Sequence, residues 1–296
     1  MKKSVSLVLG SGGARGYAHI GAIEEILKRG YKIDAVSGSS MGALIGGLYA
    51  CGKLKEYKEW VLELDFLDVI KLLDLSFAPS GLIKGDKLFE ILESLIKDTL
   101  IENLNIPYTA VATDLLNQKE VWFQKGRLID AIRASIAIPT FFTPKKINNK
   151  IFVDGGIANP LPIAPIISQM SDLVIAINLN SNSRALIDIK LTKKEQKEKE
   201  EAKNIFLELL NNLNINIKEE EKKKDENLTY ISLISRSLDI MQNILSSYKI
   251  AGYRPDILIE IPKDSAMFYE FHRAKELIRL GSKIAKKALD EYESRL

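Results

Sequence analysis

Residues 33–50 read IDAVSGSSMGALIGGLYA, and this stretch decides the fold. The mainly apolar residues 33–36 predict a strand, and the small and apolar residues from Met41 to Ala50 predict a helix. Between them, Gly38-Ser39-Ser40-Met41-Gly42 matches Gly-x-Ser-x-Gly, a pattern typical of a sharp strand-to-helix turn that exposes a serine hydroxyl. The start of a helix also favours negative charge that develops beside it. Ser40 is therefore the candidate nucleophile, whereas Ser39 lacks the flanking glycines.

The segments around this stretch predict the rest of an α/β fold. The run SVSLVL at 4–9 is rich in β-branched residues and ends in glycines, and apolar residues then follow at helical spacing from Tyr17 to Arg29. Two strands alternating with two helices at the start of the chain indicate a parallel sheet covered by helices. Further strands are expected at 108–113, 120–123, 151–153, 173–178 and 257–261, helices through most of 55–100, and long helices at 228–248 and 268–289.

A glycine-rich segment, Gly10-Ser11-Gly12-Gly13-Ala14-Arg15-Gly16, follows the first predicted strand. Free backbone N–H groups in such a loop can hold an oxyanion or a phosphate. Dinucleotide binding fits poorly, because Arg15 takes the place of the third fingerprint glycine and Asp34 lies at the start of the second strand rather than at its end. We therefore expect an oxyanion hole that faces Ser40. Arg15 either anchors this loop or favours an anionic substrate.

A nucleophilic serine needs a base, and the chain offers two kinds. The only histidines are His19 and His272. Ser40, Asp154 and His272 follow the order of the α/β-hydrolase triad, although Ser40 comes early for that fold and His272 lies in a charged helix. Asp154 itself is the other candidate, since a carboxylate at a strand end before two glycines is held on a tight, open turn. The residues alone leave both alternatives open.

The three motifs that end at Gly16, Gly42 and Gly156 occur in the order and rough spacing of the patatin-like phospholipases, which this sequence resembles. The sequence is similar above all to small bacterial members related to neuropathy target esterase. Further similar stretches lie at 112–115, 132–139 and 255–260. The resemblance covers most of the chain outside a charged segment at 190–227. It implies a three-layer α/β/α sandwich around a mainly parallel sheet. Because the sequence shows neither an internal repeat nor a second domain with its own turn signals, we expect a single domain over residues 1–296.

The same resemblance implies a serine acyl hydrolase that cleaves lipid carboxylic esters, of a phospholipid or a lysophospholipid, through an acyl-enzyme. Ser40 is then the nucleophile and Asp154 the base of a dyad without histidine, and neither a cofactor nor a metal is needed. Ser11 stands where many members have the first glycine of the oxyanion motif, but a serine keeps the backbone N–H. The expected supporting residues are Gly12, Gly13, Ala14, Arg15 and Gly16 in the oxyanion hole, Gly38, Ser39, Met41 and Gly42 around the nucleophile, and Gly155 and Gly156 after the base. An acyltransferase with the same nucleophile is an alternative, as is a binding module that acts through a partner.

Composition limits the remaining classes. The 296 residues carry a formal net charge of +3, so no strong field favours nucleic acid as a partner. Cys51 is the single cysteine, which excludes an intrachain disulfide and favours a compartment that keeps thiols reduced. The apolar run near the N-terminus is too short for a signal peptide, and no run approaches the roughly 18 apolar residues of a membrane span. We expect a cytoplasmic protein that contacts the membrane surface transiently; nothing indicates its oligomeric state.

Residues 190–227 differ in character from the rest of the chain. They hold runs of mixed charge around apolar positions that form one broad stripe of a predicted amphipathic helix. These positions are Ile205, Phe206, Leu209, Leu210 and Leu213. We interpret the segment as a mobile helical insertion that covers the Ser40 cleft until lipid is met. A plain surface helix and a partner surface are the alternatives.

Overall fold

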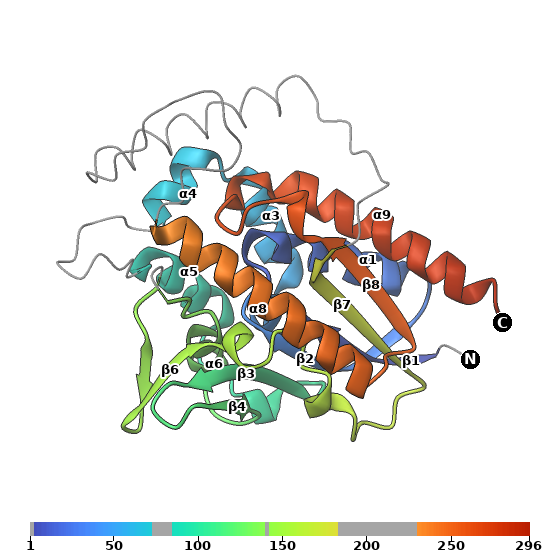
Figure 1. Cartoon of the computed structure of the whole chain (residues 1–296), viewed down its shortest axis with the longest axis horizontal. Helices are drawn as coiled ribbons and strands as arrows, with labels where there is room; N and C mark the ends of the chain where they lie inside the picture. The colour runs from blue at the N-terminus through green and yellow to red at the C-terminus, as the bar shows by residue number, and fades with distance from the viewer. Residues whose placement is uncertain (1–2, 73–84, 140–141, 183–229) are drawn as a thin grey trace.

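The computed structural model of the chain describes residues 3–72, 85–139, 142–182 and 230–296 (Figure 1). In this part of the chain, eight strands form one sheet. Their bounds are Ser4–Leu9 (β1), Lys32–Ser39 (β2), Tyr108–Asp114 (β3), Lys119–Phe123 (β4), Lys145–Ile147 (β5), Lys150–Asp154 (β6), Leu173–Ser181 (β7) and Ile257–Pro262 (β8). The helices are Tyr17–Lys28 (α1), Met41–Ala50 (α2), Leu54–Glu63 (α3), Phe66–Leu72 (α4), Asp86–Ile96 (α5), Leu128–Ser135 (α6), Tyr230–Gly252 (α8) and Ala274–Glu293 (α9).

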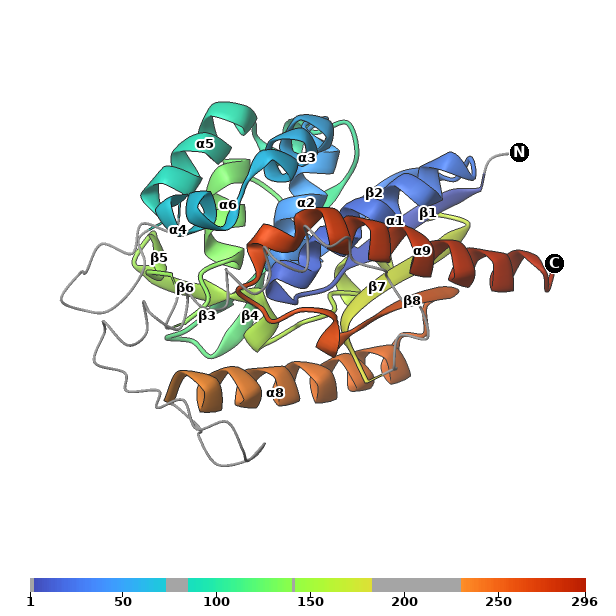
Figure 2. The same cartoon turned by 90° about the horizontal axis from the view of Figure 1, so that it is seen from above.

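The sheet is mainly parallel, and helices cover both of its faces. Its strands follow the order β5-β6-β3-β2-β1-β7-β8, and β4 pairs with β3 outside this path. Alternate residues of β1 point to opposite faces. Val5, Leu7 and Leu9 pack into the core formed with α1, α2 and α9, whereas Val8 packs with Leu161 in a second core on the other face. Helix α8 lies on that second face (Figure 2). The expected three-layer α/β/α sandwich is confirmed.

A junction along one edge of β3 positions the site. Strand β2 runs parallel to β3 and ends with Ser39 beside Val111, whereas β6 runs antiparallel to β3 and ends with Asp154 beside Ala112. Strand β4 pairs with both of these stretches of β3, so it occupies the opposite edge and leaves β2 and β6 end to end on the same edge. The carboxyl ends of two strands that run in opposite directions therefore meet at adjacent residues of β3.

Helices α1 and α9 cross at close range on the face of the sheet opposite α8 (Figure 2). A Cβ atom at Gly21 would lie 1.9 Å from the carbonyl oxygen of Ile278, and one at Gly281 would lie 1.9 Å from that of Ala18. The two backbones therefore approach at a point where a side chain on either glycine would collide. This crossing fixes the last helix of the chain against the first.

The structure differs from the sequence prediction at several element boundaries and in one strand, and three of these differences have a clear physical reason. Strand β2 continues past Val36 to Ser39, because residues 37–39 stay in register with β3. The prediction omits β5, which is joined to β6 by a turn at Asn148 and Asn149, both with positive φ; adjacent asparagines that tolerate this conformation are a hairpin signal. The last helix begins at Ala274 rather than at residue 268, because the chain before it binds the glycine loop and then forms a 3-10 turn.

The charged insertion predicted at 190–227 lies outside the described residues, as do residues 73–84 of the stretch predicted to be mainly helical. That residues 1–296 form a single domain stays a prediction. Among the helices that the structure describes, none is both long and apolar enough to cross a membrane.

The crossing of α1 and α9 predicts a loss of stability from a small substitution. Inside a helix, Gly→Ala ordinarily stabilises a protein by up to about 1 kcal/mol, because it lowers the entropy of the unfolded chain. At Gly281 the added methyl group collides with the backbone of α1. We therefore expect Gly281→Ala to lower the free energy of unfolding by about 2 kcal/mol, measured by urea titration. The control is Gly252→Ala, since nothing lies within 4 Å of a Cβ atom there; an equal effect of both changes would show that the crossing has room for a side chain.

Candidate active site

Ser40 occupies a strained turn between β2 and α2. Its backbone has φ 55° and ψ −124°, a conformation that residues other than glycine rarely adopt. The turn requires glycine at position 42, because a Cβ atom there would lie 2.1 Å from the carbonyl oxygen of Leu9 in β1. Strain of this kind costs on the order of 1–3 kcal/mol and persists where the surrounding structure enforces it. The turn projects the Ser40 hydroxyl from the end of the sheet.

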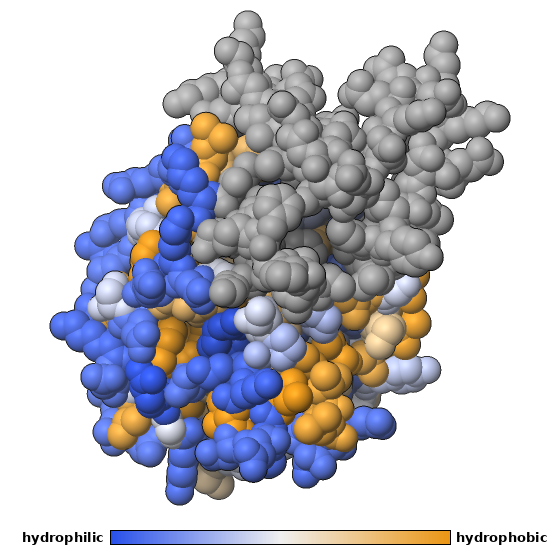
Figure 3. All heavy atoms as spheres, turned by 90° about the vertical axis from the view of Figure 1, so that its left-hand side faces the viewer, coloured by the Kyte–Doolittle hydropathy of each residue, from blue (hydrophilic) through white to orange (hydrophobic). Residues whose placement is uncertain are grey.

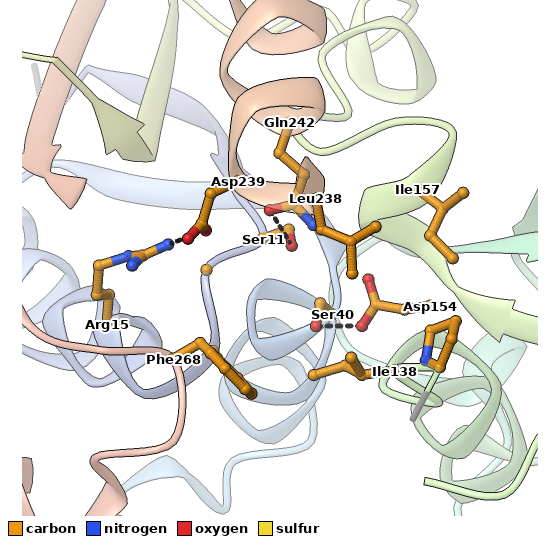
Figure 4. Close-up of a pocket in the computed structure, with 13 residues that line it drawn as sticks. Ser11, Arg15, Ser40, Ile138, Asp154, Ile157, Leu238, Asp239, Gln242 and Phe268 are labelled. Carbon is orange, nitrogen blue, oxygen red and sulfur yellow. Dashed lines mark hydrogen bonds and ion pairs between the residues drawn. The ribbon is translucent and has the colours of Figure 1, made fainter. Parts of the chain in front are cut away.

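The Ser40 hydroxyl donates a hydrogen bond to the Asp154 carboxylate, with 2.5 Å between Oγ and Oδ2 (Figure 4). The other carboxylate oxygen, Oδ1, accepts a hydrogen bond from the N–H of Gly156 at 2.7 Å. The turn Gly155–Ile157 that makes this bond passes so close to β3 that a Cβ atom at its first residue would lie 2.0 Å from the carbonyl oxygen of Val111. The structure thus brings the two expected catalytic side chains into direct contact.

Burial changes the acidity of Asp154. The residue is 2 % exposed, and loss of solvent raises its pKa to about 7, while the hydrogen bonds from Ser40 and Gly156 act in the opposite direction. Desolvation disfavours the charged form of a carboxylate, and here it outweighs both hydrogen bonds. A carboxyl group that titrates near neutrality is suited to take a proton from a serine hydroxyl and to give it back.

A second serine holds the backbone of the candidate nucleophile. The Ser135 hydroxyl, at the end of α6, accepts a hydrogen bond from the N–H of Ser40 at 2.9 Å and donates one to the carbonyl oxygen of Val111 at 2.6 Å. Ser135 therefore ties the turn at Ser40 to the residue of β3 beside which β2 ends. The sequence prediction assigned it no role. The available signal was a serine among the apolar buried positions of α6.

The glycine loop brings two backbone N–H groups to the cleft. Gly12 and Gly13 line it together with Ser40. Within the described residues, no acceptor is paired with the N–H of Gly12 or of Gly13, whereas the N–H of Ala14 donates to the carbonyl oxygen of Phe268 at 2.8 Å. Gly13 has φ 55°, and a Cβ atom there would lie 2.5 Å from the same carbonyl oxygen. Where the loop lines the cleft beside Ser40, these two N–H groups are therefore without an acceptor among the described residues.

The other residues of these two motifs have packing roles. Gly16 lies beneath Met41, where a Cβ atom would be 2.4 Å from that of Met41. Ser39 is fully buried, and in the described part of the chain its hydroxyl has no hydrogen-bond partner. Gly38 packs against the first turn of α2, since a Cβ atom there would lie 2.3 Å from the carbonyl oxygen of Gly42. These contacts hold the glycine loop, the end of β2 and the start of α2 together.

Arg15 anchors the glycine loop and ties it to α8. Its guanidinium donates hydrogen bonds to the carbonyl oxygens of Lys263 and Ala266 at 3.0 and 3.1 Å and to the side chain of Asn180 at 2.9 Å. It also forms an ion pair of 3.2 Å with Asp239 of α8 (Figure 4). Its side chain is 3 % exposed. The geometry supports the anchoring role among the two that the sequence left open.

Neither histidine lies between the nucleophile and the carboxylate. His19 is buried in α1 with its Nε2 atom 2.8 Å from the carbonyl oxygen of Gly10, and burial lowers its pKa to about 4. His272 lies in the 3-10 turn Phe271–Arg273 and packs edge-on against Phe66, with 5.2 Å between the ring centroids. The direct contact of hydroxyl and carboxylate leaves no space for an imidazole between them. The part of the chain that the structure describes also holds no group of three or more His, Cys, Asp or Glu that could bind a metal ion.

Ser40 lies between two cavities and lines both. The first holds about 530 Å³ of empty space, part of it open to solvent, and is bounded by the glycine loop and α8. The second holds about 600 Å³, again partly open to solvent, and is lined mainly by apolar side chains, among them residues of α2, α3, α4 and α5. Its lining includes Leu44, Val69, Leu88, Ile136 and Phe142.

A sequence model of the patatin-like phospholipases matches residues 7–167, which include Ser40 and Asp154. The chain belongs to the patatin-like phospholipase family. It is 36 % identical to the NTE family protein Rv1063c of Mycobacterium tuberculosis, over 98 % of this chain and 92 % of that protein. It is 31 % identical to patatin-like phospholipase domain-containing protein 7 of Rattus norvegicus, over 60 % of this chain and 14 % of that protein.

The fold resembles that of VipD from Legionella pneumophila, with a TM-score of 0.50 and 14 % sequence identity over 98 % of this chain and 67 % of that chain. The resemblance that the three motifs predicted is therefore confirmed. As a member of a family of lipid acyl hydrolases, the enzyme is an ester hydrolase, and its substrates are lipid esters.

Helix α8 brings side chains to the cleft of this patatin-like enzyme that the sequence prediction did not mark. Leu238, Asp239 and Gln242 line the first cavity (Figure 4). The Ser11 hydroxyl of the glycine loop donates a hydrogen bond to Gln242 at 3.3 Å. No local pattern could have indicated these residues, because they reach the site through a pairing of segments more than 220 positions apart in the sequence.

The buried carboxylate predicts that Asp154 makes the enzyme less stable as pH rises. An unfolded aspartate has a pKa of about 3.9, whereas burial raises the pKa of Asp154 to about 7 in the folded enzyme. Between these values the folded state keeps a proton that the unfolded state releases, so the free energy of unfolding falls as pH rises through this window. Asp154→Asn removes this effect. At about pH 8 we expect the variant to be more stable than the wild type by an amount on the order of 3–4 kcal/mol, a difference that disappears at about pH 4.

Urea unfolding of both proteins at the two pH values measures this difference. The other carboxyl groups titrate alike in the two proteins, so they cancel when the free energies are subtracted. Ser40→Ala keeps the carboxylate and is the matched control: without the hydrogen bond from Ser40 the pKa of Asp154 rises further, so this variant should show at least the pH dependence of the wild type. A difference between wild type and Asp154→Asn that stays constant with pH would contradict the buried proton acceptor.

Proposed function

We propose that the enzyme hydrolyses carboxylic esters of phospholipids or lysophospholipids, with Ser40 and Asp154 as a catalytic dyad and a covalent acyl-enzyme as the intermediate. The observation that carries this proposal is the 2.5 Å hydrogen bond between the two side chains. A base in direct contact with the nucleophile can take its proton without an intervening imidazole. The positive-φ turn and the N–H groups of Gly12 and Gly13 supply the other parts that acyl transfer needs.

In the first half of the reaction, the Ser40 oxygen attacks the ester carbonyl carbon while Asp154 takes the hydroxyl proton. The carbonyl oxygen becomes an oxyanion, which the N–H groups of Gly12 and Gly13 stabilise. The tetrahedral intermediate then collapses: the bond between the acyl carbon and the leaving oxygen breaks, and the leaving alcohol takes the proton from Asp154. The acyl group remains esterified to Ser40.

In the second half, a water molecule takes the place of the leaving alcohol. Asp154 accepts one proton from this water, and the resulting hydroxide attacks the acyl carbon. The second tetrahedral intermediate collapses by releasing the Ser40 oxygen, which regains the proton from Asp154. The products are a fatty acid and the free enzyme, so the carboxylate returns to its starting state after each turnover.

The two cavities suggest how a lipid ester lies across Ser40. The apolar cavity between α2, α3, α4 and α5 suits a hydrocarbon chain, because each buried methylene contributes roughly 0.8 kcal/mol to binding. The cavity beside α8 is lined by Asp239, Gln242 and Ser11 and suits the more polar leaving group. We propose that the acyl chain occupies the first of these and the head-group part of the substrate the second.

Substitution of the dyad tests the mechanism. Ser40→Ala removes the nucleophile, and we expect kcat/KM for a short soluble ester to fall by at least about a thousandfold, with loss of labelling by a fluorophosphonate probe. Asp154→Asn removes the base and should cost nearly as much. Ser39→Ala is the matched control for the first change. The Ser39 hydroxyl neighbours Ser40 in the sequence, but it is buried and has no hydrogen-bond partner among the described residues. A loss of activity in His272→Gln as severe as that in Ser40→Ala would contradict the dyad.

A bulky residue in the apolar cavity tests the placement of the acyl chain. Val69 lines this cavity from α4. In Val69→Phe the larger ring occupies space equal to roughly two methylenes, so we expect kcat/KM for long-chain esters to fall about tenfold more than for butyrate esters. Leu62→Phe on α3 is the control, because Leu62 is exposed and lines neither cavity. Equal losses on short and long chains in Val69→Phe would contradict the placement.

A further inference from the structure

Helix α8 has an unusual distribution of polar and apolar side chains. Its contacts with the glycine loop and with β7 are polar: Asp239 pairs with Arg15, Gln242 with Ser11, and the Asn243 amide donates a hydrogen bond to the carbonyl oxygen of Asn180. A surface helix normally turns its apolar side to the core and its polar side to water. In the middle of α8, polar side chains face the protein.

The outer side of the same helix carries an exposed apolar stripe. Ile240, Met241, Ile244 and Tyr248 follow at spacings of one, three and four residues, which places them on one side of a helix. Their exposed fractions are 59, 46, 49 and 72 %. Single exposed apolar residues are common on soluble proteins, whereas a row of four on one helix marks an interaction surface.

An aromatic residue on β4 continues this stripe. Lys249 of α8 forms an ion pair of 3.7 Å with Glu120 of β4. Trp122 lies two residues further along the strand, so it points to the same face of the sheet, and its ring N–H donates a hydrogen bond to Glu120 at 3.1 Å. The Trp122 side chain is 42 % exposed. Figure 3 shows apolar side chains gathered towards the lower right. The right-hand side of Figure 3 is the side that faces the viewer in Figure 1, where α8 lies in front of the sheet.

Basic side chains flank the stripe, while Glu120 beside Trp122 is paired with Lys249. Arg236 and Arg254 are exposed on either side of it along the chain. The single acidic side chain described on α8, Asp239, is turned to Arg15 and lines the cleft. Tryptophan and tyrosine with flanking basic residues are typical of surfaces that rest in the head-group region of a bilayer.

We infer that the outer surface of α8, formed by Trp122, Ile240, Met241, Ile244 and Tyr248, docks on a lipid bilayer that contains anionic lipids. The helix would lie in the plane of the head groups, and its other side would face the Ser40 cleft. This inference deepens the proposed function, since it names the surface through which the enzyme meets its substrate. A lipid occupant fits better than a second copy of the chain because the substrates of the family are lipid esters and the same helix lines the cleft that would receive them.

Vesicle binding tests the docking surface in the full-length chain. The parent chain carries Ser40→Ala so that lipid is not consumed, and two variants each add a double substitution to it. All three are sedimented with vesicles of phosphatidylcholine alone or mixed with phosphatidylglycerol. Ile240→Gln with Ile244→Gln alters the stripe and keeps good helix propensity. Leu27→Gln with Leu62→Gln alters two exposed leucines of α1 and α3, on the face of the molecule opposite α8 (Figure 2).

We expect the chain with an unaltered surface to bind the mixed vesicles more tightly than phosphatidylcholine alone. The α8 variant should bind the mixed vesicles at least about tenfold more weakly, since two apolar side chains no longer enter the bilayer. The control variant should bind like its parent. With Ser40 restored, the α8 variant should hydrolyse a short soluble ester at the wild-type rate and lose activity selectively on vesicles.

Equal vesicle binding by the two double variants, or no binding by their parent, would overturn the inference. A dimer in solution that the α8 changes alone convert to a monomer, with vesicle binding unaltered, would assign the surface to a second copy of the chain and overturn it as well. Hydrolysis of the soluble ester tests the proposed function separately from the docking surface. A wild type that binds vesicles but cleaves no ester would refute the hydrolase mechanism without contradicting the docking surface.

Discussion

The end-to-end meeting of β2 and β6 on one edge of β3 is the constraint on which the site depends. Strand β2 ends beside Val111 and β6 beside Ala112, so the turns that follow the two strands share one place at the sheet edge. A slip of one residue in either strand would turn its side chains to the other face and separate Ser40 from Asp154. The carbonyl group of Val111 reinforces this register. It accepts a hydrogen bond from the Ser135 hydroxyl, and it leaves no room for a side chain on Gly155.

Several features that destabilise a fold gather at this junction. Ser40 has a positive φ, Asp154 is a carboxyl group removed from water, and the N–H groups of Gly12 and Gly13 have no acceptor among the described residues. In the proposed mechanism each feature serves acyl transfer: the first exposes the nucleophile, the second sets the acidity of its base, and the third leaves N–H groups to bind the oxyanion. The surrounding core contains fully buried aliphatic side chains such as Leu9, and the close crossing of α1 and α9 fixes the layer behind it. Stability built up away from the site allows these local costs at the site.

The parts of this architecture that depend on neighbouring residues could be predicted from the sequence. Helix α2 has the predicted bounds because a glycine-flanked turn and a run of small and apolar residues mark both of its ends locally. The choice of base depends on contacts between distant residues: Ser40 and Asp154 are 114 positions apart, and the residues alone left His272 as a competitor. A family resemblance favoured Asp154, and the structure then brought it into contact with Ser40. No local sequence pattern and no family motif marks the α8 side chains that line the cleft, because they reach it only through the fold.

Helix α8 connects the two ends of the proposed reaction path. Ser11 and Arg15 lie on either side of Gly12 and Gly13 in the glycine loop, and each contacts α8, through Gln242 and Asp239 respectively. The loop is also anchored independently of α8, because Arg15 binds two carbonyl oxygens that precede α9. The position of α8 and the geometry of the two N–H groups are therefore coupled, but the loop keeps a fixed point of its own. The surface proposed to meet lipid lies on one side of α8, and the loop proposed to hold the oxyanion lies on the other. Two side-chain contacts, Gln242 with Ser11 and Asp239 with Arg15, connect the helix to the loop.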